Sequence, residues 1–244
     1  MARIQAVFFD VDGTLIDSSD AHAHAWLDAL RGHGRDVPYE LVRSKIGMGG
    51  NKLLKEICGL EADSTEGRLL VERRVSLFRA HYLPDLGPLP GARSLVSRLR
   101  MRGLQCVVVT SATRAEVADL LRGAAVADLL TNVIDADSAD GKKSDPELVQ
   151  AALDRVGVGP RQALMIGDTP YDIAAAARAG VSTIAFRSGG WKDRDLAGAL
   201  AIYDHPADLL ARIEQSPLAL GVDDAMPAPA PPSSRRPRRA ALHR

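Results

Sequence analysis

Four aspartates follow apolar stretches of the sequence, in two pairs that lie far apart along the chain. Asp10 and Asp12 end the first apolar stretch, and Asp168 and Asp172 come after residues 163–166. Carboxylates gathered in one place repel each other, so a group of four needs a cation between them. Oxygen ligands without histidine or cysteine are those that Mg²⁺ prefers. The pattern therefore indicates a magnesium site, if the fold brings both pairs together.

The spacing of Asp10 and Asp12 gives the two carboxylates different tasks. At the end of a strand, one can face a metal ion and a phosphorus atom while the other reaches a proton on the leaving group. Carboxylates act as nucleophiles in phosphoryl transfer, and a neighbouring acid can protonate the departing oxygen. Gly13 permits a sharp turn, and Thr14 could add a hydroxyl or an amide to a phosphate site. Taken alone, two aspartates at this spacing also suit a plain metal site or a turn.

Short apolar stretches alternate with stretches of helical pattern, and this alternation indicates the fold class. β-Branched and aromatic residues predict strands, and the segments between them predict helices. The predicted strands are 4–11, 105–110, 163–166 and 181–186, with a weaker one at 131–134, and the predicted helices are 92–102, 114–124, 146–156 and 172–179. Such alternation is typical of a parallel α/β sheet. Because sites in these sheets form at the carboxyl ends of strands, we expect the aspartates and Thr110 to meet there.

Residues 19–87 interrupt the alternation with helical patterns only. The expected helices lie near 20–33, 38–46, 50–59 and 64–82, and the Pro-rich stretch 83–91 is the expected return linker. An all-helical insertion of this length predicts a separate small lobe. The expected organisation is an α/β core of residues 1–18 and 88–214, a helical cap of residues 19–87, and a disordered Pro- and Arg-rich tail of residues 215–244.

Residues 9–18, Phe-Asp-Val-Asp-Gly-Thr-Leu-Ile-Asp-Ser, resemble the first motif of the haloacid dehalogenase-like hydrolase superfamily. The second motif of that superfamily is an apolar strand that ends in Thr or Ser, as residues 107–110 do. Its fourth motif, Gly-Asp-x-x-x-Asp, is matched in full by residues 167–172. The resemblance covers roughly residues 3–213. It implies a Rossmann-like three-layer α/β core with a central parallel sheet and an inserted all-helical cap domain.

The third motif of the superfamily is a lysine, usually in the pattern Lys-Pro-x-Pro before a helix. Residues 143–146, Lys-Ser-Asp-Pro, keep this spacing but have Ser144 where proline is common. Lys143 is therefore expected to steady the charge of the nucleophile and of the phosphoryl group. The adjacent Lys142 is the alternative.

The resemblance implies a magnesium-dependent phosphatase that acts on a small phosphate ester. In this mechanism Asp10 attacks phosphorus and forms an aspartyl phosphate, while Asp12 protonates the leaving oxygen and later deprotonates a water molecule. Mg²⁺ is held by Asp10, the backbone carbonyl of Asp12, Asp168 and, less directly, Asp172. The phosphoryl oxygens are neutralised by the metal and by donors of the chain, which are Thr110, the amides of Ser111 and Ala112, and Lys143.

The helical insertion resembles the cap of the subfamily that includes phosphoglycolate phosphatase, sugar-phosphate phosphatases and β-phosphoglucomutase. His22 lies early in the first cap helix, as a histidine does in the mutase, and is either functional or a helix-face histidine. Residues 46–52 are Gly-rich and form either a loop that contacts substrate or a plain turn. Arg43, Lys45 and Lys52 beside this loop either meet an anionic substrate or stay solvated.

Three other functions share some of these features. A β-phosphoglucomutase-like phosphotransferase has every core motif, but it typically carries an arginine soon after the cap-loop glycine, and residues 47–50 contain none. A true haloacid dehalogenase lacks an acid at the position of Asp12 and does not use magnesium. A non-catalytic phosphate-sensing protein on the same fold would have little reason to keep clustered buried carboxylates. Phosphomonoester hydrolysis is the favoured interpretation.

The composition gives no sign of a macromolecular partner. Basic and acidic residues number 31 each, and the tail 221–244 holds five arginines and two aspartates, so the remainder is slightly negative. Nucleic acid and anionic membranes are therefore not expected partners. Two cysteines without zinc or disulfide spacing, and no signal peptide or long apolar stretch, favour a cytoplasmic location. The expected state is a monomer or a homodimer, and the tail is either a dispensable extension or a weak contact with RNA or lipid.

Overall fold

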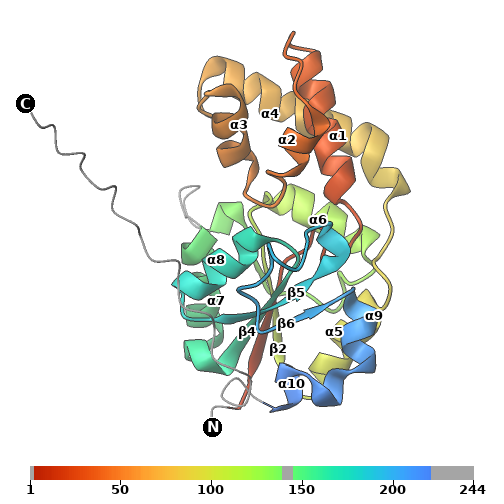
Figure 1. Ribbon diagram of the computed structural model, residues 1–244, viewed down its shortest axis with the longest axis vertical. Helices are drawn as coiled ribbons and strands as arrows, with labels where there is room; N and C mark the ends of the chain where they lie inside the picture. Colours follow the sequence, from red (N-terminus) through yellow and green to blue (C-terminus); the bar gives the residue numbers. More distant parts are fainter. Residues whose placement is uncertain (1–2, 139–144, 221–244) are drawn as a thin grey trace, which may run out of the picture.

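The computed structural model describes residues 3–138 and 145–220, which form an α/β core with a helical lobe beyond the carboxyl ends of its strands (Figure 1). Across these residues the sheet is entirely parallel, in the order β3-β2-β1-β4-β5-β6. The strands are β1 Ala6–Phe9, β2 Gln105–Val109, β3 Val133–Ile134, β4 Ala163–Gly167, β5 Ser182–Phe186 and β6 Ala201–Tyr203. The chain runs outward from β1 to β3 and then crosses back to β4, on the other side of β1. This reversal puts the switch point of the sheet at the carboxyl end of β1, where parallel sheets form their sites.

Strand β1 is buried on both faces, each under its own helix layer. Val7 and Phe9 belong to one hydrophobic cluster, and Ala6 and Phe8 belong to another on the opposite face. The first layer contains α5 Ala92–Met101, α6 Arg114–Gly123 and α9 Pro206–Ala211, and the second contains α7 Asp145–Val156 and α8 Pro170–Arg178. A strand covered on both faces needs an uninterrupted apolar sequence. This requirement explains why β1 reads Ala-Val-Phe-Phe rather than alternating with polar residues.

The lobe has a hydrophobic core of its own. It consists of α1 Ser19–Arg31, α2 Tyr39–Arg43, α3 Gly50–Cys58 and α4 Thr65–Leu77, and α4 is extended by a π-helical turn, Phe78–Tyr82, and a 3₁₀ turn, Leu83–Asp85. Trp26, Leu30, Leu54 and Leu70 pack together at its centre. Residues 19–87 are all described, and none of them forms a strand.

The predicted fold class is confirmed, and the five predicted strands and the core helices occur at the expected places, with ends that differ by a few residues. Two elements were missed. Strand β6 has only three residues and reads Ala-Ile-Tyr, and α9 has six. Segments this short give too few positions for a hydrophobic period to stand out.

The predicted start of the tail, at residue 215, was wrong. Ile213–Gln215 forms a 3₁₀ turn and α10 spans Pro217–Leu220. Ser216 and Leu218 are buried, and Leu218 belongs to the same hydrophobic cluster as Phe9. The adjacent Ser216 and Pro217 resemble a linker in composition, but Pro217 occupies the first turn of a helix, where its missing N–H has no cost. The rest of the predicted tail, 221–244, lies outside the described residues.

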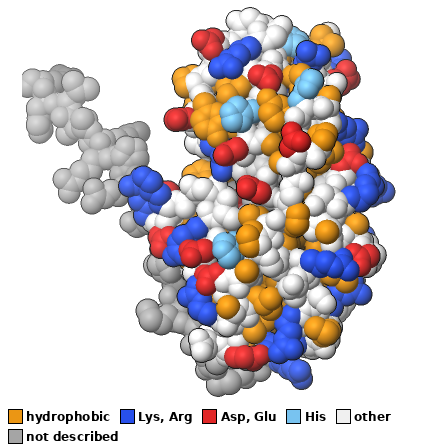
Figure 2. Space-filling view, turned by 90° about the vertical axis from the view of Figure 1, so that its right-hand side faces the viewer, with side chains coloured by type: hydrophobic (Ala, Val, Ile, Leu, Met, Phe, Trp, Pro, Cys, Tyr) orange, Lys and Arg blue, Asp and Glu red, His pale blue; other side chains and the backbone are white. Residues whose placement is uncertain are grey.

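The surface mixes both signs of charge. On the face shown in Figure 2, acidic and basic side chains are interspersed over core and lobe, with hydrophobic side chains scattered between them. None of the helices in the described part of the chain is both long enough and apolar enough to span a bilayer.

Gly91 and Gly103 provide a test of the packing between α5 and α9. Both have a positive φ, 78° and 81°, but a Cβ on Gly91 would lie 2.7 Å from the Cα of Ala207 in α9, whereas a Cβ on Gly103 would meet nothing within 4 Å. We expect Gly103→Ala to lower the free energy of unfolding by about 1–2 kcal/mol through backbone strain alone. Gly91→Ala should add a steric cost of about 1–3 kcal/mol. Urea unfolding of both variants measures the difference, and equal losses would show that α9 does not constrain the start of α5.

Candidate active site

The polar side chains of the site follow the carboxyl ends of three neighbouring strands. Asp10 follows β1, Thr110 follows β2 and Asp168 follows β4, and these strands are adjacent in the order β2-β1-β4. Asp172 lies in the first turn of α8, which begins directly after β4. Residues that are distant in the sequence thus meet because parallel strands present their carboxyl ends at one edge.

Asp10, Asp168 and Asp172 form a cluster that could hold a metal ion. One ligand atom from each lies within 4.8 Å of the others. Burial, followed by the charge of Asp172, raises the pKa of Asp10 and that of Asp168 well above the ordinary value for an aspartate. Three ionised carboxylates buried this close together would repel each other strongly. A divalent cation bound between them would offset that repulsion.

The surroundings of Asp168 fit such a cation. Its Oδ2 is buried and has no hydrogen-bond partner within residues 3–138 and 145–220. Two glycines keep the space beside this atom free, because a Cβ on Gly189 would lie 1.9 Å from it and a Cβ on Gly13 would lie 2.3 Å from it. An oxygen-only donor set with one uncommitted buried oxygen suits a hard divalent ion.

Hydrogen bonds fix the orientation of the cluster. Thr14 donates its hydroxyl to Asp168 Oδ1 at 2.8 Å, and its amide donates to the carbonyl of Val11. Both groups that were expected to bind phosphate thus have partners within the chain, and the hydroxyl orients Asp168. The expected phosphate contact of Thr14 stays a prediction. Asp172 Oδ2 accepts from the amide and hydroxyl of Thr169, at 2.9 and 2.7 Å, in a capping box at the start of α8.

Asp12 turns its carboxylate away from the other acids and toward the lobe. Its Oδ1 accepts a hydrogen bond from the Ser18 hydroxyl and lies 2.8 Å from Nε2 of His22 in α1. Burial acts to raise the pKa of Asp12, but the His22 ring, the Ser18 hydroxyl and the charge of Arg74 together bring the pKa below its ordinary value. The side chain is not part of the acidic cluster. The expected contribution of Asp12 to metal binding, through its backbone carbonyl, stays a prediction.

His22 is held by a chain of contacts that the sequence did not reveal. Its ring stacks on Phe78, with centroids 4.0 Å apart and planes 8° from parallel. Nη2 of Arg74 in α4 lies 2.6 Å from His22 Nδ1, and Arg74 also forms an ion pair with Glu116 of α6. A guanidinium can only donate, so Nδ1 must accept and Nε2–H donates to Asp12. The ring therefore orients the carboxylate of Asp12, and the predicted substrate contact of His22 stays a prediction.

Arg74 and Glu116 were missed because nothing in the sequence separates them from their neighbours. Arg74 lies in a helix of alternating charge beside Arg73, and Glu116 looks like an ordinary acid in the first turn of α6. Their meeting depends on how the lobe sits on the core, which no local pattern encodes.

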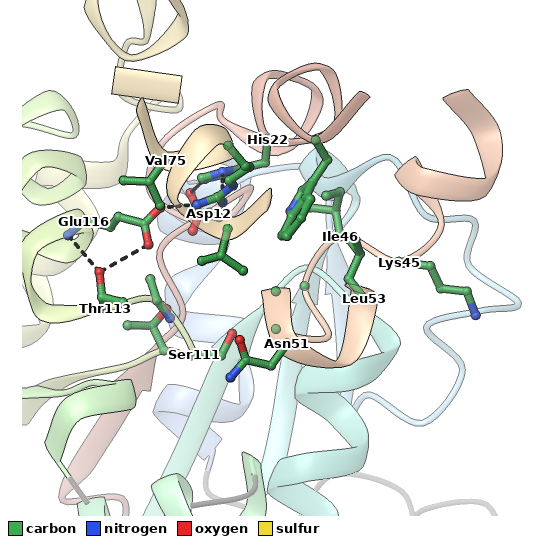
Figure 3. A pocket seen from close by; sticks show the side chains of 18 of the residues that line it. Asp12, His22, Lys45, Ile46, Asn51, Leu53, Val75, Ser111, Thr113 and Glu116 are labelled. Carbon is green, nitrogen blue, oxygen red and sulfur yellow. Dashed lines mark hydrogen bonds and ion pairs between the residues drawn. The ribbon is translucent and has the colours of Figure 1, made fainter. Parts of the chain in front are cut away.

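A cavity of about 140 Å³ lies between core and lobe, and Figure 3 shows its wall. From the core it is lined by Asp10, Asp12, Thr110, Ser111, Ala112, Thr113 and Glu116, and from the lobe by His22, Trp26, Lys45, Ile46, Gly47, Gly49, Gly50, Asn51, Leu53, Val71, Arg74 and Val75. The Gly-rich loop predicted to contact substrate is thus part of the wall. A second, smaller cavity of about 30 Å³ is lined by Asp10 and Asp172 and shares Gly47, Thr110 and Ser111 with the first.

The end of β2 supplies hydroxyl and amide groups to the cavity. Thr110 is buried, and the amide of Ala112 donates to its hydroxyl oxygen at 3.2 Å. The N-cap of α6 is Thr113, whose hydroxyl accepts a hydrogen bond from the amide of Glu116. Thr110 therefore does not cap this helix. The predicted phosphate-binding role of Thr110, Ser111 and Ala112 is compatible with their positions in the wall.

Of the three cations predicted beside the cap loop, Arg43 and Lys52 are not part of the wall, and Lys45 is part of it but directs its ammonium group away. Arg43 reaches from the lobe to the core, where it donates to the carbonyl of Gly189 at 2.6 Å and pairs with Asp20. Lys45 pairs with Glu56 and extends away from the cavity (Figure 3). Lys52 is exposed and is not part of the wall. The predicted catalytic Lys143, like its alternative Lys142, lies outside the described residues.

Comparison with known proteins agrees with this geometry. Residues 4–180 match the family of haloacid dehalogenase-like hydrolases. The chain belongs to that family. Phosphoglycolate phosphatase of Rhodospirillum rubrum is 34% identical over 218 residues, which cover 84% of this chain and 89% of the relative.

Solved structures show the same architecture. A hydrolase from Pseudomonas syringae superimposes with a TM-score of 0.80 at 28% identity, over 86% of this chain and 98% of its own. β-Phosphoglucomutase of Clostridium difficile has the same fold, with a TM-score of 0.71 at 21% identity, over 87% of this chain and 96% of its own. On the sequence matches and the family, the hydrolase described here is an enzyme of the phosphatase class.

Gly189→Ala tests the cation site without altering a carboxylate. The new methyl group would displace Asp168 Oδ2, so we expect the affinity for Mg²⁺ to fall by about 10–100-fold, as it does when the surroundings of metal ligands are disturbed. The rise in melting temperature on addition of Mg²⁺ measures this affinity in the absence of substrate. Gly87→Ala is the control, because a Cβ there meets nothing within 4 Å. An unchanged Mg²⁺ response in the Gly189 variant would place the cation elsewhere.

Proposed function

We propose that this phosphatase is a magnesium-dependent phosphomonoester hydrolase that acts on a small phosphorylated metabolite through an aspartyl-phosphate intermediate. The observation that supports it most is the division of the two aspartates after β1. Asp10 belongs to the acidic cluster, and Asp12, two residues on, faces the cavity and the lobe. A nucleophile and a proton carrier thus stand on either side of the place where a phosphate ester would lie.

The cation would be held by Asp10, Asp168 and Asp172, and Mg²⁺ fits their oxygen-only donor set. When bound, it would neutralise charge on the phosphoryl oxygens and hold the phosphoryl group for in-line attack. Thr110 and the backbone amides of Ser111 and Ala112, which belong to the same wall, would donate to these oxygens. Lys143 is expected to add a positive charge.

Asp10 attacks phosphorus, and the bond to the leaving oxygen breaks. Asp12 gives its proton to that oxygen and then takes one from the water that hydrolyses the aspartyl phosphate. Ser18 and His22 both contact Oδ1 of Asp12. The other oxygen, Oδ2, would therefore carry the proton that is transferred. Burial acts to raise the pKa of Asp12, but its contacts with His22 and Ser18 lower it, which suits the base that the second step requires. A bound phosphate ester adds negative charge nearby and raises this pKa, which favours the acid form needed in the first step.

A β-phosphoglucomutase-like phosphotransferase is the alternative. Such an enzyme must bind a second phosphate in the cavity, which calls for a cation there. Within the described wall the cations are Arg74, which is paired with Glu116, and Lys45, which is paired with Glu56. The cap loop 47–50 also lacks arginine. Hydrolysis, with water as the acceptor, is therefore favoured.

A small-molecule substrate, a cytoplasmic location and a monomeric or homodimeric state belong to the same proposal. Charges of both signs on the surface and a substrate-sized cavity support the first. Native mass determination in solution would decide the oligomeric state.

Asp10→Asn tests the nucleophile. An amide cannot form the phosphoenzyme, so we expect hydrolysis of p-nitrophenyl phosphate with Mg²⁺ to fall by a factor on the order of 10³ or more, with the fold intact. Asp17→Asn is the matched control, because Asp17 is exposed and outside the cavity wall. Melting temperature and circular dichroism check the fold. Residual activity within about tenfold of the parent would exclude Asp10 as the nucleophile.

Beryllium or aluminium fluoride tests the phosphoryl site. These anions mimic the phosphoryl group at Asp10, so they should inhibit hydrolysis, and inhibition should require Mg²⁺ because the cation balances their charge beside the acidic cluster. Inhibition curves with and without Mg²⁺ provide the measurement. Inhibition of equal strength in its absence would contradict the assigned position of the metal.

A further inference from the structure

The wall of the cavity beyond Asp12 contains an ion pair that is already complete. Arg74 and Glu116 face each other there with side chains only 13% and 7% exposed. Arg74 comes from α4 of the lobe and Glu116 from α6 of the core, so the two domains share this pair. The positive charge of Arg74 is therefore balanced before any substrate enters.

Two nitrogen atoms of the Arg74 guanidinium have partners, and the third has none. Nη1 meets Glu116 and Nη2 meets His22, and the guanidinium carbon lies 5.6 Å from the ring centroid of Trp26 and 5.5 Å from that of Phe78. The group thus lies beside two aromatic rings. Nε is buried and has no hydrogen-bond partner in the part of the chain that the structure describes. An acceptor atom on a bound molecule could satisfy it.

The remaining charges of this wall decide what kind of acceptor that is. Asp10, Asp12 and Glu116 are its acids, and Arg74 is the cation beside Asp12 and Glu116. Lys45, the other cation among the described residues of the wall, pairs with Glu56 and points away (Figure 3). A carboxylate on the leaving group would add a further negative charge opposite a single guanidinium, in surroundings where charges interact strongly. A hydroxyl or carbonyl oxygen would accept from Nε without that penalty.

The volume of the cavity and the polarity of its wall further limit which leaving groups can bind. Apolar side chains of the lobe cover much of the wall, namely Trp26, Ile46, Leu53, Val71 and Val75. These side chains can pack against the carbon atoms of a leaving group. The cavity volume of about 140 Å³ must also hold the phosphoryl group, and a cavity of about 150 Å³ accommodates a molecule the size of benzene. The cavity volume therefore favours a leaving group with few heavy atoms.

We propose that the enzyme selects phosphate esters whose leaving group is small, hydroxylated and uncharged, and that the Arg74–Glu116 pair is the element that rejects carboxylate-bearing leaving groups. This inference rests on the proposed phosphatase function. The proposed substrate preference differs from that of the phosphoglycolate phosphatase of R. rubrum, whose named substrate has a carboxylate one carbon from the ester oxygen. Glu116 sets the charge of the wall, and Arg74 supplies the donor.

A matched pair of substrates tests the proposal on the unaltered enzyme. 2-Phosphoglycolate and 2-hydroxyethyl phosphate both have two carbon atoms. They differ only in the terminal group, which is a carboxylate in the first and a hydroxymethyl group in the second. We expect kcat/KM for 2-hydroxyethyl phosphate to exceed that for 2-phosphoglycolate by about tenfold or more, since one unpaired charge in a buried site discriminates at least that well. If turnover of the pair is slow, their inhibition constants against p-nitrophenyl phosphate give the same ratio. A ratio near unity, or a preference for phosphoglycolate, would overturn the inference.

Two variants of α6 separate charge in the cavity from contact between the domains. Glu116→Gln removes the negative charge but keeps an acceptor for Arg74, and should shift the ratio toward 2-phosphoglycolate by about tenfold. Asp119→Asn also removes an acid that pairs with an arginine of the lobe, since Asp119 lies 3.1 Å from Arg79, but Asp119 is not in the cavity wall. It should leave the ratio unchanged. Equal shifts in both variants would mean that domain contact, and not cavity charge, controls the choice.

The outcomes distinguish the two proposals. Absence of Mg²⁺-dependent phosphate release from p-nitrophenyl phosphate, 2-hydroxyethyl phosphate and 2-phosphoglycolate alike would overturn the proposed function, and the inference with it. Hydrolysis of any of these esters combined with the wrong ratio for the matched pair would overturn the inference alone.

Discussion

The mutual repulsion of buried carboxylates is the constraint on which this structure depends. Asp10, Asp168 and Asp172 are brought within 4.8 Å of each other by the adjacency of β1 and β4, and burial opposes their ionisation. The fold supplies what such a cluster requires. Two glycines clear the space at Asp168 Oδ2, a threonine hydroxyl holds Oδ1, and the start of α8 holds Asp172. The cleared space beside Asp168 Oδ2 fits a cation, whereas the capping box at the start of α8 would also stabilise that helix without one.

The sequence was sufficient for the core and for the acids because both follow local rules. A strand buried on two faces must be apolar throughout, as β1 is, and a site residue of a parallel sheet must follow such a strand. These rules located Asp10, Thr110 and Asp168 at one edge. They failed where the element is too short to show a period, as in β6, and where composition resembles a linker, as at Pro217.

The side chains that complete the cavity could not be found in the same way. Arg74 and Glu116 are 42 residues apart and belong to different domains, so their contact depends on the position of the lobe on the core. The positive residues that the sequence did suggest, Arg43 and Lys52, flank the cap loop but lie outside the wall. A charged residue beside a glycine-rich loop is a plausible ligand, yet helix geometry decides whether its side chain faces the cavity or solvent.

Arg74 links the choice of substrate to the handling of the proton. Through Nη2 it fixes the His22 tautomer that donates to Asp12, and through Nη1 it holds Glu116 at the far wall. Any displacement of α4 from α6 would therefore disturb both the orientation of Asp12 and the charge that a leaving group meets. A leaving group that bound Arg74 as an anion would compete with Glu116 and weaken the support of His22. A neutral one would engage only Nε and leave the proton carrier in place, so good placement of Asp12 and rejection of anionic leaving groups follow from the same guanidinium.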